Sequence, residues 1–142
     1  MIFLDSSLVV RRYLRERDHD LLENRLGKGE SVFLSELVRV EFPSAVWRRS
    51  RGGSLERERA RLVLAEFSSD REQYGFVPVS PGVLDRAAAL LERHALRSLD
   101  AIQLASAQVA AEGSPEPMRF GSADARLNAA AKAEGLALLL EE

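Results

Sequence analysis

Hydrophobic residues along the chain form short apolar runs, and longer segments between these runs carry apolar residues at every third or fourth position. Short runs of this kind predict buried strands, and the periodic segments predict amphipathic helices. We expect strands at residues 1–4, 31–34, 75–79, 118–121 and 136–140. We expect helices at residues 6–16, 19–26, 36–51, 54–73, 82–94, 98–112 and 123–134. The alternation predicts an α/β fold with a parallel sheet covered by helices.

Turn-forming residues mark the breaks between these segments. They occur at Gly52-Gly53, at Ser80-Pro81-Gly82 and in the loop 113–117. The chain has 142 residues, 46% of them hydrophobic, and shows no repeat or long linker, so we expect a single domain over residues 1–142. Pro43 lies inside the helical pattern and predicts a kink, because it lacks one backbone donor.

Composition excludes several classes of function. The chain has 22 acidic and 20 basic residues, so its net charge of -2 gives no overall attraction to nucleic acid, and any such binding needs local patches. The absence of cysteine excludes disulfides, thiolate metal sites and a thiol nucleophile. The first residues lack a basic leader, and the apolar run LALLL is too short for a membrane span, so we expect a cytoplasmic protein.

Four carboxylates occupy unusual positions. Asp5 ends the first predicted strand, where parallel sheets place ligand-binding groups, and Glu41 shares a helix face with apolar residues. In the stretch LRSLDAIQLASA, Asp100 lies among Leu99, Ala101 and other apolar residues that predict an almost completely buried helix. An unpaired ionised carboxylate is costly to bury, so its charge needs compensation.

Each acid also has a purely structural explanation. Asp5 could cap the helix that begins at Ser6 or Ser7, and Glu41 could pair with a buried arginine. In Ser98-Leu99-Asp100 and Ser122-Ala123-Asp124, the serine could cap a helix and the aspartate could lie in its first turn, where the helix dipole favours an acid. Taken singly, none of the four acids defines a site.

The four acids together favour a metal site. A parallel sheet brings the ends of its strands to one edge, so the acids would share one pocket. Their mutual repulsion would raise their pKa values and oppose folding unless a cation neutralised them. Mg²⁺ or Mn²⁺, which prefer oxygen ligands, would do so.

The motifs FLDSSLVVRRYL, SELVRVEF, LRSLDAIQLASA and FGSADARLNAAAKAEGL resemble those of PIN-domain nucleases, and specifically the VapC toxins of toxin–antitoxin pairs. The resemblance covers essentially the whole chain. It implies an α/β/α sandwich with a central parallel sheet and a metal-dependent endoribonuclease that cleaves RNA. It also implies a homodimer and an antitoxin that inhibits the enzyme by covering the acidic pocket.

Carried over by position, the four acids of the family correspond to Asp5, Glu41, Asp100 and Asp124, and its hydroxyl positions correspond to Ser7 and Ser122. Pro43 departs from the aliphatic or small residue expected after the motif glutamate. Because the pocket is anionic, RNA needs additional cations at the rim. The candidates, each of which could instead be solvated or salt-bridged, are Arg11, Arg12, Arg48, Arg49, Arg51 and Arg97.

Three other functions stay open at this point. A PIN nuclease could act in RNA processing without an antitoxin. A phosphatase-like enzyme could use Asp5 as a nucleophile, but that chemistry usually places a second aspartate two positions later, where this chain has Ser7. A non-catalytic binding module is the third, and the presence of all four acids disfavours it.

Overall fold

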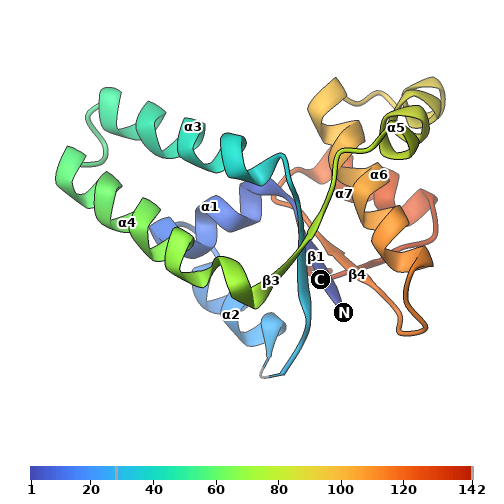
Figure 1. Ribbon diagram of the computed structural model, residues 1–142, viewed down its shortest axis with the longest axis horizontal. Coiled ribbons are helices and arrows are strands. Elements are labelled where there is room, and N and C mark those ends of the chain that lie inside the picture. Colours follow the sequence, from blue (N-terminus) through green and yellow to red (C-terminus); the bar gives the residue numbers. More distant parts are fainter. Residues whose placement is uncertain (28, 142) are drawn as a thin grey trace.

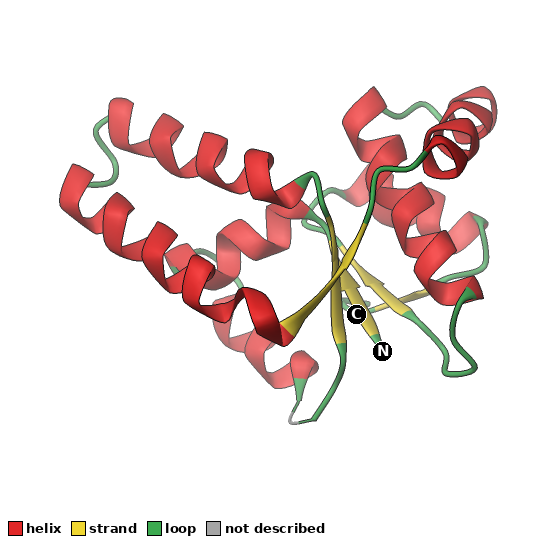
Figure 2. Cartoon of the chain, viewed as in Figure 1, coloured by secondary structure: helices red, strands yellow, loops and turns green. Residues whose placement is uncertain are grey.

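A five-stranded sheet forms the centre of the computed structural model, which describes residues 1–27 and 29–141 (Figures 1 and 2). The strands are β1 (Ile2–Leu4), β2 (Val32–Ser35), β3 (Tyr74–Val77), β4 (Arg119–Gly121) and β5 (Ala137–Leu138). Their order is β3-β2-β1-β4-β5, and every neighbouring pair is parallel. The predicted parallel sheet is therefore confirmed.

Helices cover both faces of the sheet (Figures 1 and 2). One layer contains α1 (Ser6–Leu14), α2 (His19–Leu26), α3 (Val38–Arg51) and α4 (Arg57–Asp70), followed by the short 3₁₀ helix η1 (Arg71–Gln73). The other contains α5 (Pro81–Arg93), α6 (Ser98–Glu112) and α7 (Ala125–Ala133). The described residues thus form the expected α/β/α sandwich.

The central strand β1 is buried on both sides. Ile2 and Leu4 pack into the apolar cluster under α1–α4, whereas Phe3 points into the cluster under α5–α7 and stacks on Phe120. A strand covered on both faces carries a continuous apolar run, which explains the first residues of the chain.

A glycine allows α1 to approach the end of β4 closely. A Cβ atom on Gly121 would lie 2.8 Å from Leu8 Cδ1 of α1. The missing side chain therefore lets the start of α1, which carries Asp5 and Ser7, lie against the segment that follows β4, which carries Ser122.

The described helices begin and end within three residues of the predicted positions. The segment predicted as one helix over 54–73 divides into α4 and η1. Pro43 lies inside α3 without ending it, because a missing donor removes only one backbone hydrogen bond.

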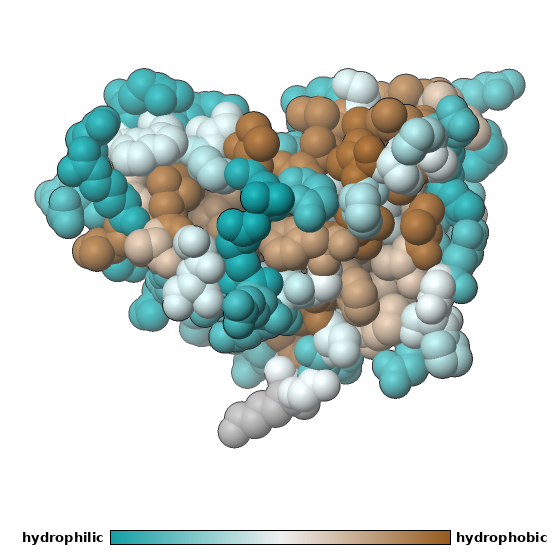
Figure 3. Space-filling model, in the orientation of Figure 1, coloured by the Kyte–Doolittle hydropathy of each residue, from teal (hydrophilic) through white to brown (hydrophobic). Residues whose placement is uncertain are grey.

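Several large apolar side chains remain exposed. They include Val40 of α3 at 72% exposure and Leu99 of α6 at 48%. On the face shown in Figure 3, hydrophobic side chains gather over the region of α5 and α6. Within the described residues, no helix combines the length and the apolar character that a membrane crossing requires.

Candidate active site

A pocket of about 580 Å³ lies beside the carboxyl ends of β1 and β4, between α1, α3 and α6. All four predicted acids line it: Asp5 and Asp124 follow these strands, Glu41 comes from α3 and Asp100 from α6. The parallel sheet and the inward face of α3 therefore bring together residues that are far apart in the sequence.

Asp5 is the buried member of this group, with 4% of its surface exposed. Its Oδ1 accepts hydrogen bonds from Ser7 Oγ at 2.6 Å and from the Leu8 backbone N–H at 3.2 Å, so Asp5 also caps α1. Its Oδ2 accepts from Ser122 Oγ at 2.6 Å. Burial raises the pKa of Asp5 to about 6, against the opposing effect of these three donors, and the nearby charge of Asp100 adds to the rise.

The two predicted hydroxyls connect the ends of β1 and β4. Ser7 Oγ accepts a hydrogen bond from the Ala123 N–H at 2.9 Å, and Ser122 Oγ accepts from the Asp124 N–H at 3.0 Å. The side-chain amide of Asn128 donates to the Ser122 carbonyl at 2.9 Å. Each serine thus donates to Asp5 while a backbone N–H fixes its oxygen, which gives the Asp5 carboxylate a defined orientation.

Glu41 accepts hydrogen bonds from a hydroxyl and an amide. In the described part of the chain, it does not pair with a buried arginine, the alternative considered for it from the sequence. Glu41 Oε1 accepts from Ser6 Oγ at 2.6 Å and from Gln103 Nε2 at 2.8 Å. Gln103 Nε2 also donates to Ser6 Oγ at 3.0 Å. Gln103 is 2% exposed, and its Oε1 lacks a hydrogen-bond partner among the described residues. Sequence reasoning missed Gln103, although its position three residues after Asp100 places both on one face of α6.

Asp100 is less enclosed than its apolar neighbours predicted. Its side chain is 23% exposed, and its Oδ2 lies 3.5 Å from Arg97 Nε. The expectation of an almost completely buried helix is wrong for this turn, because the first turn of α6 borders the pocket and leaves Leu99 48% exposed. Arg97 precedes α6 at the cap position without a side-chain cap, so Ser98 does not cap the helix as considered.

Asp124 itself caps α7, in place of Ser122. Its Oδ1 accepts from the backbone N–H groups of Arg126 at 2.8 Å and Leu127 at 3.3 Å. The arrangement considered for this acid, with Ser122 as the cap and Asp124 in the first turn, is therefore wrong, because Asp124 is itself the cap; its carboxylate also lines the pocket. In the described chain, these bonds engage only one of its two oxygens.

The chemistry of these donors suits a hard divalent cation. The acidic side chains offer only oxygen, and histidine does not line the pocket in the described part of the chain. The acids are not arranged as a ready cluster, since the described residues contain no group of three or more Asp, Glu or His side chains spaced to hold one ion. The pocket thus fits a magnesium or manganese site in donor type, while a bound ion would need the carboxylates to move closer together.

Intramolecular salt bridges separate the predicted rim arginines into two kinds. Arg11 and Arg49 line the pocket but are paired, Arg11 with Asp18 at 3.0 Å and Arg49 with Glu16 at 2.8 Å. Arg12 lies outside the pocket, where it donates to Glu23 and Tyr74.

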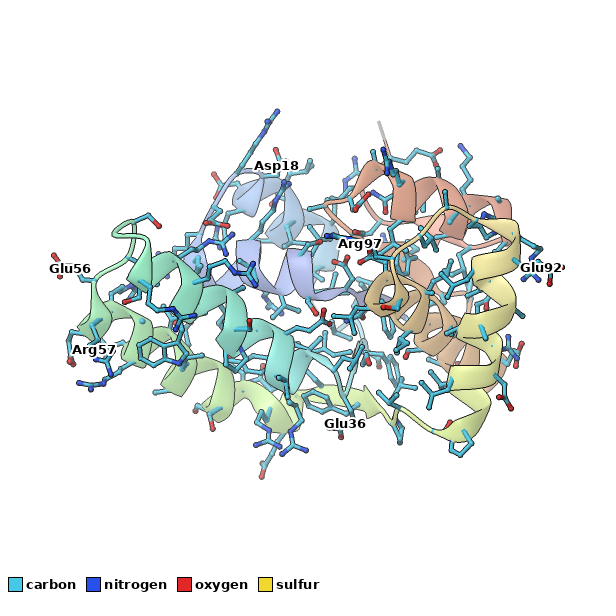
Figure 4. The ribbon with its side chains drawn as sticks, turned by 90° about the horizontal axis from the view of Figure 1, so that it is seen from above. Asp18, Glu36, Glu56, Arg57, Glu92 and Arg97 are labelled. Atoms are coloured by element: carbon cyan, nitrogen blue, oxygen red, sulfur yellow. The ribbon has the colours of Figure 1, made fainter. Side chains whose placement is uncertain are left out.

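Arg48 and Arg97 line the pocket and are available to a ligand, whereas Arg51 is exposed outside it. Arg48 contacts only Ser44 Oγ, at 3.5 Å, within the described structure. Figure 4 shows Arg97 between α1 and α6. Within the described structure, Arg48 therefore remains unpaired beside the acids, and Arg97 is paired only with Asp100.

Fold and pocket together define an α/β sandwich with a carboxylate pocket at the carboxyl edge of a parallel sheet. A family model described as PIN domain matches residues 2–133, and the chain belongs to this family. The chain is also 34% identical over 138 residues to Ribonuclease VapC46 of Mycobacterium tuberculosis, a match that covers 97% of this chain and 95% of the relative. These findings confirm the resemblance that the sequence motifs indicated.

Solved structures of low sequence identity share the fold. FitAcB from Neisseria gonorrhoeae has a TM-score of 0.68 at 15% identity, with 97% of this chain and 96% of that chain covered. VapBC2 from Rickettsia felis, bound to a DNA fragment from their promoter, has a TM-score of 0.65 at 15% identity, with 97% of each chain covered. A toxin–antitoxin complex from Klebsiella pneumoniae has a TM-score of 0.63 at 15% identity over the full length of both chains.

Proposed function

We propose that this protein is a metal-dependent endoribonuclease and the toxin of a toxin–antitoxin pair. The observation that carries the proposal is that Asp5, Glu41, Asp100 and Asp124, which correspond to the four acids of PIN nucleases, line one pocket. The similarity to a protein named as a VapC ribonuclease supports the same activity. The single domain expected over residues 1–142 and a cytoplasmic location belong to this proposal.

The four carboxylates would hold Mg²⁺ or Mn²⁺, which when bound supplies an activated water and neutralises charge on the phosphate. The chain itself orients the ligands. Ser7 and Ser122 fix Asp5 through both carboxylate oxygens, and Ser6 and Gln103 fix Glu41 through Oε1. Arg48 and Arg97 at the rim would bind phosphates of the RNA on either side of the acids.

The pocket also suits an antitoxin that inserts an arginine or lysine among the acids, where the cation would form charge-assisted hydrogen bonds. Val40 and Leu99 line this pocket and are 72% and 48% exposed, so an inhibitory segment would find apolar contacts beside the charged ones. Similarity to solved structures described as toxin–antitoxin complexes supports such a partner.

A homodimer forms part of the proposal. Leu84 and Leu91 lie seven residues apart on α5 and are 46% and 41% exposed, and Leu62 of α4 is 53% exposed. Residues spaced by two helical turns share one face, so α5 presents an apolar stripe to a second copy. Light scattering at micromolar concentration should report twice the mass of one chain.

Ribonuclease activity of Asp100→Asn tests the proposed function. We expect the cleavage rate with Mn²⁺ to fall by two to three orders of magnitude, on the order of the effect of removing one charge-stabilising group from an active site. Asp85→Asn, which alters an exposed acid of α5 outside the pocket, is the control and should cut RNA at the wild-type rate.

Thermal melts add a readout that does not depend on cleavage. A cation that binds only the folded state adds roughly 2.7 kcal/mol at a hundredfold excess over Kd. Mn²⁺ should therefore raise the melting temperature of the wild type and of Asp85→Asn more than that of Asp100→Asn. Equal cleavage rates and equal metal responses in all three proteins would contradict the proposal.

A further inference from the structure

We propose that the acidic pocket continues into a groove along the start of α7, that this groove takes an unpaired segment of the RNA substrate, and that Arg126 binds a phosphate there. The inference rests on the proposed ribonuclease function and adds Arg126 and the surface around it to the residues that bind the RNA. Arg126 is absent from the rim arginines that the sequence motifs suggested.

Three adjoining pockets form the proposed binding surface for the RNA. The second pocket, of about 470 Å³, shares Arg97, Asp100 and Asp124 with the acidic pocket. It also contains Arg126, which it shares with a further pocket of about 350 Å³. We call the two smaller pockets together the α7 groove; its other lining residues are His94, Ala95, Leu96, Ala125, Ala129 and Ala130.

Among the residues described, the α7 groove contains an unpaired cation, Arg126, and its acids, Asp100 and Asp124, lie at the junction with the acidic pocket. Arg126 is exposed and its side chain forms no salt bridge within the described structure, unlike the ion-paired Arg11 and Arg49 of the acidic pocket. Arg97, at the junction of the pockets, is 88% exposed and pairs only with Asp100 at 3.5 Å. Because Asp100 is a proposed metal ligand, a bound ion would compete for its carboxylate and leave Arg97 free for a phosphate.

The apolar part of the α7 groove consists of Leu96 and several alanines. Leu96 and Ala95 come from the loop between α5 and α6, and Ala129 and Ala130 come from α7. Such a surface can accept the flat face of a base, but bases in a duplex are stacked on one another and cannot reach it. An apolar surface beside an unpaired arginine therefore fits one nucleotide of an unpaired strand.

The free arginines lie on opposite sides of the acids. Arg48 belongs to α3 in one helical layer, and Arg126 belongs to α7 in the other (Figure 1). A strand bound by both would cross the pocket from layer to layer and present the phosphate between them to Asp5 and Asp100. This placement gives the carboxylates a single phosphodiester bond to act on.

Steady-state cleavage of a single-stranded RNA of about 12 nucleotides in Mn²⁺, a length within the range that single-strand binding folds cover, tests the groove. We expect Arg126→Ala to raise KM about fivefold with kcat unchanged. The dependence of log(kcat/KM) on log salt should become shallower by about 0.7, the value for one phosphate contact to a single strand. Arg59→Ala, an exposed arginine of α4 that lines none of these pockets, is the control and should match the wild type.

A second variant leaves Arg126 in place. Ala129→Glu introduces a negative charge into the groove at an exposed helical position, and it should raise KM as Arg126→Ala does. Ala65→Glu, at an exposed position of α4, is its control and should leave KM unchanged. Circular dichroism should be the same for all four variants.

The outcomes separate the groove from the proposed function. If the wild type cuts RNA while Arg126→Ala and Ala129→Glu behave like their controls, the groove is wrong and the nuclease stands. If the wild type cuts the same strand equally well when it is annealed to its complement, the α7 groove does not take an unpaired strand and the proposal is wrong. If the wild type cuts no RNA in Mn²⁺, both the function and the groove fail.

Discussion

Two polar clusters lie at opposite ends of α1, and they differ in how the charges of their acids are compensated. At the start of α1, Asp5 is buried with two serine hydroxyls, and the charge of another acid, Asp100, raises its pKa further. At the end of α1, Tyr13 donates to Asp70 at 2.8 Å and its oxygen lies 2.6 Å from the Tyr74 hydroxyl. We call these the Asp5 cluster and the Tyr13 cluster.

The Tyr13 cluster satisfies its own charges. Because Tyr13 donates to Asp70, the Tyr74 hydroxyl must donate to Tyr13, and Arg12 donates in turn to Tyr74 at 3.0 Å. The chain of bonds thus runs from a cation to an anion. Among the described residues, the Asp5 cluster contains hydroxyls and acids but no buried cation, and it opens into a pocket. Removing one member of a cluster that pairs its charges internally destabilises the fold, whereas a cluster that leaves like charges together is a candidate ligand site.

The largest expected difference between the clusters is in stability. Without metal, Asp5→Asn should have a higher free energy of unfolding than the wild type at neutral pH. The pKa of Asp5 rises from 3.8 to about 6 on folding, so the folded protein binds the proton more tightly than the unfolded chain does. The free energy of unfolding therefore falls as pH increases from 4 to 6, by at most about 3 kcal/mol at 1.36 kcal/mol per pKa unit. Asparagine has no such charge and still caps a helix well.

Urea unfolding in chelator measures this difference. Asp5→Asn should be more stable than the wild type at pH 7, and the gap should close below pH 4. Asp85→Asn, which removes an exposed acid, should follow the wild type at every pH. A variant less stable than the wild type at pH 7 would show that the Asp5 carboxylate supports the fold as the Tyr13 cluster does.

The next effect concerns the Tyr13 cluster. Tyr13→Phe removes the donor to Asp70 and the acceptor for Tyr74 in a buried setting, so we expect a loss of about 1 to 2 kcal/mol in the free energy of unfolding. Ribonuclease activity should not change. Tyr74→Phe should cost a similar amount, and the double variant should cost less than the sum, because both break one chain of bonds. Additive losses would show that the two hydroxyls act independently.

Regular periodicity explains why the fold could be predicted. The alternation of apolar runs and helical segments determined the parallel sheet, and α2 and α6 begin and end where the sequence pattern placed them. The four acids could be predicted as neighbours for the same reason, since strand ends of a parallel sheet meet at one edge.

Contacts between individual side chains could not be predicted in this way. Arg11 and Arg12 are adjacent in sequence, but successive residues of a helix point about 100° apart, so Arg11 lines the pocket while Arg12 joins the Tyr13 cluster. Ser122 was considered as a helix cap, yet its hydroxyl donates to Asp5 because Asp124 caps α7 itself. These choices depend on which groups tertiary packing brings within hydrogen-bond reach.

The smallest expected effect concerns Gln103, whose side-chain amide donates to both Ser6 and Glu41. Gln103→Met keeps the length of the side chain but removes one of the two donors to Glu41 Oε1, and Ser6 remains as the other. We expect kcat to fall about tenfold, the lower end of the range for groups that orient metal ligands, with KM unchanged.

Gln108 of the same helix supplies the control for this variant. Its Oε1 is buried without a partner, as that of Gln103 is within the described residues, but Gln108 does not line the pocket. Each variant removes an unpaired buried carbonyl oxygen, but Gln103→Met also removes the hydrogen bonds to Ser6 and Glu41, so it should lower the stability of the fold more than Gln108→Met does. Only Gln103→Met should lower kcat. If both variants lower kcat equally, Gln103 acts through the packing of α6. The orientation of the Glu41 carboxylate then does not depend on the amide of Gln103.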